Sequence, residues 1–314
     1  MSVRSFACVG VGLVGQGWAT LFSSRGFRVI LQDVNEAILE SAVRQIKSNL
    51  VLLETNGLLK KGEANAALNR IKTTMHIAEA VSHTDYVQES VPDDYHLKKE
   101  IFKQMDALAP RHTILASSAS GLLMTEIQKG TASPERCVLV HPILPVHLIP
   151  LVEIVGGKRT SPETIRATRK TMETLGKIPV LLNKEVPGYI VNRLQAALLR
   201  EAIDLVDKGV ASAEDVDKAF CTGIGLRDPI IGPFLRIHLA GNGIDHFFDK
   251  YSQSYQYRWE SMETWTSIPS SAGLAIRNGV NEMKIVRTRA LEEIKSWRDR
   301  MLIKLLRLMR EGGM

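Results

Sequence analysis

Short apolar runs alternate with helical patterns over the first 180 or so residues of the chain. The runs lie at residues 6–11, 28–31, around 71, and at 86–89, 113–116, 137–140, 151–155 and 178–182. Most of the segments between them place apolar residues at a spacing of about 3.6, as an amphipathic helix does. This alternation is typical of a parallel sheet with helices on both faces. We therefore predict an α/β, doubly wound N-terminal domain.

Several predicted helices have clear N-terminal signals. Asn35 precedes a long apolar-periodic stretch and can cap it. Ser161, Pro162 and Glu163 supply a cap, a proline and an acid in the first turn. Ser212 and the acid three residues later resemble a capping box.

No convincing strand follows residue 185. A helix predicted over 189–208 is apolar on much of its surface, so we expect it to be covered by another domain or subunit. A last helix over 282–310 carries one apolar stripe. The chain is thus predicted to hold two domains, an α/β domain over 1–185 and an all-helical one over 186–314, with a homodimer formed through the helical part.

The first apolar run ends in Gly10-Val11-Gly12-Leu13-Val14-Gly15, and a helical pattern begins there. The first glycine of such a run allows a tight turn, the second admits a pyrophosphate, and the third lets helix pack on strand. The helix start adds free N–H groups for the phosphates. We predict dinucleotide binding, although the same run is also compatible with a plain glycine turn.

The second run ends in Asp33, about 20 residues after the glycines, where an acid holds the ribose 2′-hydroxyl. Because a carboxylate repels a 2′-phosphate, the cofactor is predicted to be NAD rather than NADP. The alternative is that Asp33 is a surface turn residue.

Two further strand ends carry polar residues. Glu89 closes the run 86–89, on the expected cofactor side of the sheet. The small residues 117–121, which include Ser120, follow the next strand. They let a ligand approach the backbone, or they form an ordinary strand-to-helix loop.

His141 stands at the end of the run 137–140, and Glu153 lies in the next strand. Both are equally far in sequence from His147, so a chain folding back there can bring them face to face. A carboxylate beside an imidazole fixes its tautomer and stabilises the imidazolium, as a general base requires. The alternative is a histidine with a purely structural role.

The composition argues against several classes of protein. Hydrophobic residues make up 45% and charged residues 24% of the 314 residues, as in ordinary globular proteins. The three cysteines are widely spaced, which argues against a disulfide framework and a metal site and favours a reducing, cytoplasmic compartment. No run is long enough to span a membrane, and the early first strand leaves no room for a leader. The net charge of +6 is interpreted as solvated helix faces without nucleic-acid binding.

These landmarks together resemble the 3-hydroxyacyl-CoA dehydrogenase superfamily over nearly the whole length. The shared motifs are the glycine turn, the serine-rich strand end, His-Pro followed by Leu-Val-Glu, and Pro-Gly-Tyr-Ile-Val-Asn-Arg-Leu at 187–194. The branch of lambda-crystallin and L-gulonate 3-dehydrogenase is suggested by Gly-Gln-Gly-Trp-Ala at 15–19, Gly-Ile-Gly-Leu-Arg at 223–227, Ile-Gly-Pro at 231–233 and Trp-Arg-Asp-Arg at 297–300.

The resemblance implies roles for individual residues. His141 matches the general base and Glu153 its orienting partner. Ser120 and Asn192 match the serine and the asparagine of the substrate pocket. It further implies that Arg227 faces a substrate carboxylate and that Glu89 lies near the nicotinamide ribose. The reaction is then hydride transfer from a secondary alcohol carbon to NAD.

Leu144 departs from this pattern, because the superfamily usually has asparagine three residues after the histidine. Leucine makes no hydrogen bond, and an unpaired polar group on the substrate costs roughly 1–3 kcal/mol. We therefore expect a less polar substrate than gulonate, or slower turnover.

The leading hypothesis is an NAD-dependent 3-hydroxyacid dehydrogenase that acts on a small free acid such as L-gulonate. One alternative keeps the chemistry but takes a 3-hydroxyacyl-CoA or a carnitine-like acid. Another is a crystallin-like structural protein that binds NAD with little activity.

Overall fold

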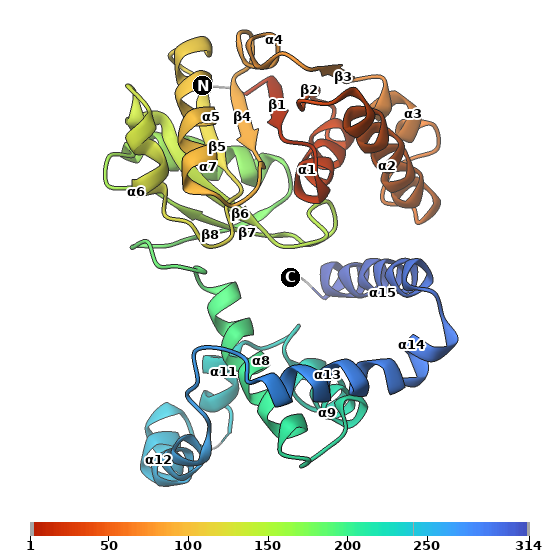
Figure 1. Ribbon diagram of the computed structural model, residues 1–314, viewed down its shortest axis with the longest axis vertical. Helices are drawn as coiled ribbons and strands as arrows, with labels where there is room; N and C mark the ends of the chain where they lie inside the picture. The colour runs from red at the N-terminus through yellow and green to blue at the C-terminus, as the bar shows by residue number, and fades with distance from the viewer. Residues whose placement is uncertain (1–2, 241, 313–314) are drawn as a thin grey trace. The chain divides into compact units, whose positions relative to one another are not determined.

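The computed structural model in Figure 1 describes residues 3–240 and 242–312, with only the backbone at residue 310. The chain forms two compact units that divide between residues 193 and 194. The sequence placed the domain boundary after residue 185. The division in the structure falls in the first turn of helix α8 (Val191–Asp207).

The first unit is organised around an eight-stranded sheet with the order β3-β2-β1-β4-β5-β6-β7-β8. The strands are β1 (Ser5–Val9), β2 (Arg28–Gln32), β3 (Ile71–Thr74), β4 (Tyr86–Glu89), β5 (Ile114–Ser117), β6 (Cys137–Pro142), β7 (Leu151–Val155) and β8 (Ile178–Leu181). Neighbouring strands are parallel except for β6 and β7, which pair antiparallel. The order from β3 to β6 is that of a dinucleotide-binding doubly wound fold, so the predicted fold class is confirmed.

Helices cover both faces of the sheet. They are α1 (Leu13–Ser24), α2 (Glu36–Thr55), α3 (Glu63–Leu68), α4 (Ile77–Val81), α5 (Tyr95–Leu108), α6 (Met124–Ile127) and α7 (Pro162–Thr174), with 3-10 turns at Gln128–Gly130 and Pro134–Arg136. Side chains from α1, α2 and α7 join one buried cluster, and side chains from α4, α5 and α6 join the other. The central strands β4, β5 and β6 are buried on both sides, whereas the edge strands β3 and β8 are partly exposed. Burial on both sides favours the apolar runs of β5 and β6.

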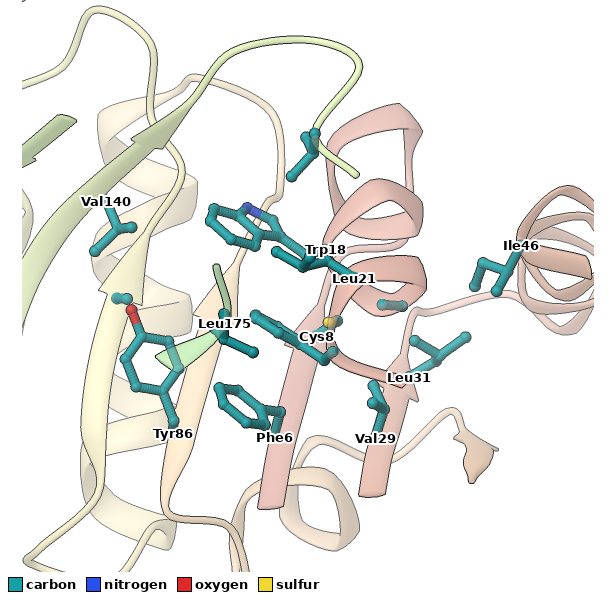
Figure 2. Packing of buried hydrophobic residues seen from close by; sticks show 14 of the residues in the cluster. Phe6, Cys8, Trp18, Leu21, Val29, Leu31, Ile46, Tyr86, Val140 and Leu175 are labelled. Carbon is teal, nitrogen blue, oxygen red and sulfur yellow. The ribbon is translucent and has the colours of Figure 1, made fainter. Parts of the chain in front are cut away.

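Strand β1 shows how the two cores are divided. Phe6 and Cys8 lie in one cluster, and Ala7 and Val9 in the other, as alternation along a strand requires. Figure 2 shows residues of the first cluster, with Phe6 beside Cys8 at its centre. The Phe6 ring stacks on the ring of Phe22, with 4.1 Å between centroids. The sheet is therefore fixed at its centre by aromatic packing, directly beneath the glycine turn.

The three predicted helix caps are present. Asn35 Oδ1 accepts a hydrogen bond from Ala37 N at 2.8 Å. Ser161 Oγ accepts from the backbone N–H three residues on, and Ser212 Oγ does the same. These local signals locate the helix starts correctly because each cap satisfies an N–H that the helix leaves unpaired.

The second unit is helical throughout its described residues. Its elements are α8, α9 (Ala213–Ala219), a π-helical turn (Phe220–Ile224), α10 (Gly225–Arg227), α11 (Pro233–His238), α12 (Ile244–Ser261), α13 (Ser270–Glu282), α14 (Lys284–Thr288) and α15 (Leu291–Glu311). The single helix predicted over 282–310 is wrong. Met283 and Arg289 have extended backbones, and the Glu293 carboxylate accepts from Ala290 N and starts a new helix there.

Helix α8 is largely exposed. Leu194, Leu198 and Leu199 are each more than 40% exposed, whereas only Ile203 and Asp204 are buried. The prediction that a partner covers this helix stays a prediction.

Candidate functional site

The glycine turn joins β1 to α1 and has the shape of a phosphate-binding loop. Gly10 has φ +82°, and its N–H donates to Gln32 O at 2.9 Å. A Cβ on Gly15 would lie 2.1 Å from Gly10 O, so only glycine fits there. A Cβ on Gly12 would meet nothing within 4 Å, which leaves space above the turn. Leu13 at the helix start is 69% exposed, and Val14 packs against the core.

Asp33 fastens this turn to β2. One carboxylate oxygen accepts from Val11 N at 2.9 Å and the other from Val34 N at 2.8 Å. The residue is partly exposed, and each oxygen keeps a second lone pair for a ligand hydroxyl. Asp33, the open space at Gly12 and the N-terminus of α1 together fit the adenosine ribose and pyrophosphate of a dinucleotide.

His141 and Glu153 are directly opposite each other in the antiparallel pair of β6 and β7. His141 Nδ1 lies 2.7 Å from Glu153 Oε2. Glu153 Oε1 accepts from Ile190 N at 2.8 Å and from Val191 N at 3.0 Å. Burial raises the pKa of Glu153, but these hydrogen bonds outweigh burial and hold that pKa below its ordinary value. The carboxylate therefore stays ionised and fixes the orientation of the imidazole.

The other ring nitrogen of His141 has no hydrogen bond to any residue that the structure describes. The ring is only 4% exposed, and it contacts the Tyr189 ring with 5.1 Å between centroids. The Tyr189 hydroxyl donates to Leu122 O at 2.6 Å. Since Nδ1 faces the carboxylate, Nε2 is the nitrogen available for proton transfer.

Ser120 and Asn192 are brought together in the first unit. Asn192 Nδ2 donates to Ser120 O at 3.0 Å. Ser120 N and Oγ both donate to Asp93 Oδ2, at 2.9 and 2.7 Å. These bonds together with the ion pair to Lys98, 3.3 Å away, lower the pKa of Asp93 against the effect of its partial burial. Asp93 was missed in the sequence. Its signal is an acid directly after Pro92 at the carboxyl end of β4.

Glu89 is completely buried and its carboxylate is occupied by protein donors. Oε1 accepts from Lys98 Nζ and from Val91 N, both at 2.7 Å, and Oε2 accepts from Ser117 Oγ at 2.6 Å. Burial raises the pKa of Glu89, and the positive charge of Lys98 opposes that rise. The expected contact with the nicotinamide ribose stays a prediction.

Arg227 and Leu144 are both exposed. Arg227 lies in α10 of the second unit, and its guanidinium has no ion-pair partner among the residues described. Leu144 lies in the proline-rich loop after His141 and is 47% exposed. An exposed apolar side chain thus follows the histidine at the position where the superfamily usually has an amide.

The residues described contain no helix that is long and apolar enough to cross a membrane. They also contain no group of three or more histidine, cysteine or acidic side chains placed to hold a metal ion.

The fold and the glycine turn are those of a dinucleotide-binding protein, and the structure places a buried histidine–carboxylate pair at the end of β6. The comparison with protein families is specific. Residues 5–186 match the 3-hydroxyacyl-CoA dehydrogenase NAD-binding domain, and residues 188–271 match the C-terminal domain of the same family. The chain belongs to the 3-hydroxyacyl-CoA dehydrogenase family and has the NAD-binding domain of these NAD-dependent enzymes, which act on a CH–OH group.

Two curated relatives cover nearly the full length. Lambda-crystallin from Oryctolagus cuniculus is 36% identical over 308 residues, 96% of this chain and 95% of that protein. L-carnitine dehydrogenase from Oceanobacillus iheyensis is 35% identical over 311 residues, 98% of this chain and 99% of that protein.

Solved structures agree with this assignment. The NAD⁺-dependent 5-formyl-3-hydroxy-2-methylpyridine 4-carboxylic acid 5-dehydrogenase superposes with a TM-score of 0.84 at 28% identity, covering 98% of this chain and 99% of that one. (S)-3-hydroxybutyryl-CoA dehydrogenase from Ralstonia eutropha gives 0.67 at 29% identity, covering 81% and 89%.

Proposed function

We propose that this protein oxidises the 3-hydroxyl group of a small free hydroxy acid, with NAD as hydride acceptor and His141 as general base. The C–H bond of the alcohol carbon breaks and its electron pair leaves as hydride to NAD. The hydroxyl proton passes to His141 Nε2, and the alcohol becomes a ketone. Atoms and electrons balance without another reactant.

The observation that carries this proposal is the 2.7 Å contact between His141 and Glu153. The carboxylate is held from the other side by two backbone N–H groups, so it cannot rotate away. In the neutral tautomer that this contact favours, the hydrogen is on Nδ1 and Nε2 is the proton acceptor, and the imidazolium that forms on proton transfer is stabilised by the adjacent charge.

Ser120 and Asn192 are proposed to hold the substrate oxygen. The Ser120 hydroxyl donates to Asp93 when no substrate is bound. Because the hydrogen of the reacting hydroxyl goes to His141, we propose that the Ser120 hydroxyl turns from Asp93 and donates to the substrate oxygen. One hydrogen of the Asn192 amide is used by Ser120 O, and the second remains for the substrate. Arg227 is proposed to bind the carboxylate of the acid, as a guanidinium suits.

Leu144 favours a substrate that is less polar than a sugar acid. Its exposed side chain provides an apolar surface and no hydrogen bond. A polar substituent placed against it loses its water without compensation.

A second candidate substrate is L-carnitine, because relatives named L-carnitine dehydrogenase match at 35–37% identity. A 3-hydroxyacyl-CoA is a third candidate, supported by the family models. The similarity to lambda-crystallin supports a structural protein that binds NAD with little turnover.

The experiment is NADH formation at 340 nm with gulonate, 3-hydroxybutyrate, carnitine and 3-hydroxybutyryl-CoA. We expect turnover on a free acid. Turnover on the CoA ester alone would replace the free-acid proposal. No turnover on any of the four, with NAD still bound, would favour the structural role.

We also infer a homodimer formed through the helical unit, supported by the exposed leucines of α8. Light scattering at micromolar concentration should give twice the mass of 34.9 kDa. The mass of a single chain would overturn this inference.

A further inference from the structure

A buried hydrogen-bond network connects α1 to the carboxyl ends of β4 and β5. Its centre is the hydroxyl of Ser118, which is 8% exposed. Trp18 Nε1 lies 3.1 Å from Ser118 Oγ, and Gln88 Nε2 lies 2.7 Å from it. The Ser90 hydroxyl oxygen is 2.9 Å from the same atom.

The chemistry of the partners fixes which group donates in each of these contacts. An indole nitrogen can only donate, so Ser118 Oγ accepts from Trp18. Gln88 Nε2 also faces Val140 O, 3.5 Å away, and a carbonyl oxygen can only accept. The amide nitrogen therefore faces Ser118 as well, and its two hydrogens go to Ser118 Oγ and Val140 O.

Ser118 thus accepts two hydrogen bonds, and its single hydroxyl hydrogen has one remaining partner, Ser90 Oγ. Ser90 accepts that hydrogen bond. Its own hydroxyl hydrogen has no acceptor among the residues described. Ser90 is partly exposed, unlike Gln88 and Ser118, so its hydroxyl can reach a ligand.

The position of Ser90 indicates which ligand that is. Its carbonyl carbon lies 2.8 Å from the place where a Cβ on Gly10 would be, and its own Cβ lies 3.7 Å from the corresponding place on Gly15. Ser90 N donates to Val9 O at 2.7 Å and thereby holds the residue beside β1. The hydroxyl therefore stands directly at the glycine turn that receives the dinucleotide.

We propose that Ser90 Oγ donates a hydrogen bond to an oxygen of bound NAD where the dinucleotide passes over this turn, and that Trp18, Gln88 and Ser118 orient it as a donor. Ser90 is then a cofactor-binding residue, and the other three are positioning residues. The proposed acceptor is an oxygen of NAD beyond the adenosine phosphate, on the second phosphate or the nicotinamide ribose. AMP lacks the linkage that would pass over the turn.

The first test measures NAD and AMP binding by calorimetry with full-length Ser90→Ala. We expect the Kd for NAD to rise about tenfold, which corresponds to about 1.4 kcal/mol, and the Kd for AMP to stay unchanged. Ser90→Thr keeps the hydroxyl and should retain most of the NAD affinity. Ser24→Ala, which removes a serine hydroxyl at the opposite end of α1, should leave both constants unchanged. An unchanged Kd for NAD in Ser90→Ala overturns the proposal.

The second test addresses the direction of the hydrogen bonds. In Gln88→Glu the carboxylate accepts from Ser118, so Ser118 can no longer donate to Ser90, and Ser90 donates inward instead. We expect a similar loss of NAD affinity in the native background and almost none in the Ser90→Ala background. Equal losses in both backgrounds overturn the orienting role. If Gln88→Glu does not fold, Gln88→Met, which removes the donor to Ser118, is measured in the same two backgrounds. Because binding is the readout, the result does not depend on the substrate.

Discussion

Two buried glutamates of the first unit sit in similar surroundings but differ in what their partners can do. Glu153 on β7 and Glu89 on β4 are both fully buried, and each accepts three hydrogen bonds. Each has one side-chain nitrogen as a partner, at 2.7 Å: His141 for Glu153 and Lys98 for Glu89. The pKa is lowered at Glu153, where hydrogen bonds outweigh burial, and raised at Glu89, where burial outweighs Lys98.

The side chain beside each glutamate determines what the contact can do. Glu89 and Lys98 form a buried ion pair 2.7 Å apart that links β4 to α5. An imidazole gains and loses a proton near neutral pH, so the same kind of carboxylate contact at Glu153 serves proton transfer. The same kind of contact thus stabilises the fold at Glu89 and is suited to proton transfer at Glu153.

The largest expected effect is a loss of turnover on substitution of His141. His141→Asn removes the proton acceptor while keeping a polar side chain in β6. Turnover should fall by about 10³-fold, within the usual range for a general base. Steady-state NADH formation and an NAD titration check this result, and NAD affinity should stay unchanged. Residual turnover above a tenth of the native rate would exclude His141 as the base.

The second prediction compares the two carboxylates directly. Glu89→Gln leaves Lys98 buried with only Asp93, 3.3 Å away, as a charged partner. The free energy of unfolding should fall by about 3 kcal/mol, as when one member of a buried pair is removed. Urea unfolding measures this loss. Because the amide keeps an oxygen for the expected contact with the nicotinamide ribose, the turnover of the folded fraction should fall less than in Glu153→Gln.

Glu153→Gln should show the reverse pattern. The amide oxygen can still accept from Ile190 N and Val191 N, so stability changes less. The amide cannot stabilise an imidazolium, and turnover should fall on the order of 10²-fold or more. If both variants lose stability and activity in the same proportion, the distinction between the two regions is wrong.

The sequence predicted the elements that hold these pairs because their signals are local. Most strands are apolar runs, although β3 (Ile71–Thr74) is largely polar, and the caps at Asn35 and Ser161 act within three residues. The His141–Glu153 pair could be predicted because the two residues are equally far in sequence from His147, and the chain folds back between them.

Contacts between distant segments left no such signal. Asp93 meets Ser120 from 27 residues away, and nothing near either residue indicates the other. Helix α12 was missed for a different reason, since its apolar stripe is aromatic. Aromatic residues recur every four positions at Phe247, Tyr251, Tyr255 and Trp259. The Phe247 ring contacts the rings of Tyr251 and Tyr255, and the Tyr255 ring contacts that of Trp259, with centroids 5.3 to 5.6 Å apart.

A third prediction concerns Lys177, a buried lysine that has no carboxylate partner among the residues described. Lys177 Nζ donates to Ile149 O at 2.6 Å and to Val146 O. Burial and the positive charge of Arg25 lower the pKa of Lys177 to about 7. Between about pH 7 and the ordinary lysine pKa of 10.5, the unfolded chain holds a proton that the folded chain lacks. Stability from this group therefore rises with pH in that window, by roughly 1.4 kcal/mol per pH unit.

Lys177→Met should abolish this rise. Urea unfolding at pH 7, 8 and 9 measures it, as the difference between native protein and variant. Lys129→Met, at a lysine whose side chain is 60% exposed, is the control and should keep the native dependence. Parallel pH profiles for Lys177→Met and the native protein would show that Lys177 keeps its proton over this range.

The smallest expected effect concerns the loop that follows His141. Leu144→Asn gives this loop an amide that can hydrogen-bond a polar substrate. One such bond is worth about 1 kcal/mol, so kcat/KM for gulonate should rise about fivefold relative to that for 3-hydroxybutyrate. Leu108→Asn changes another exposed leucine of the same unit, at the end of α5, and should leave the ratio unchanged. If Leu144→Asn leaves the ratio unchanged as well, Leu144 does not contact the substrate. The preference for a less polar acid must then arise elsewhere than in the loop next to the base.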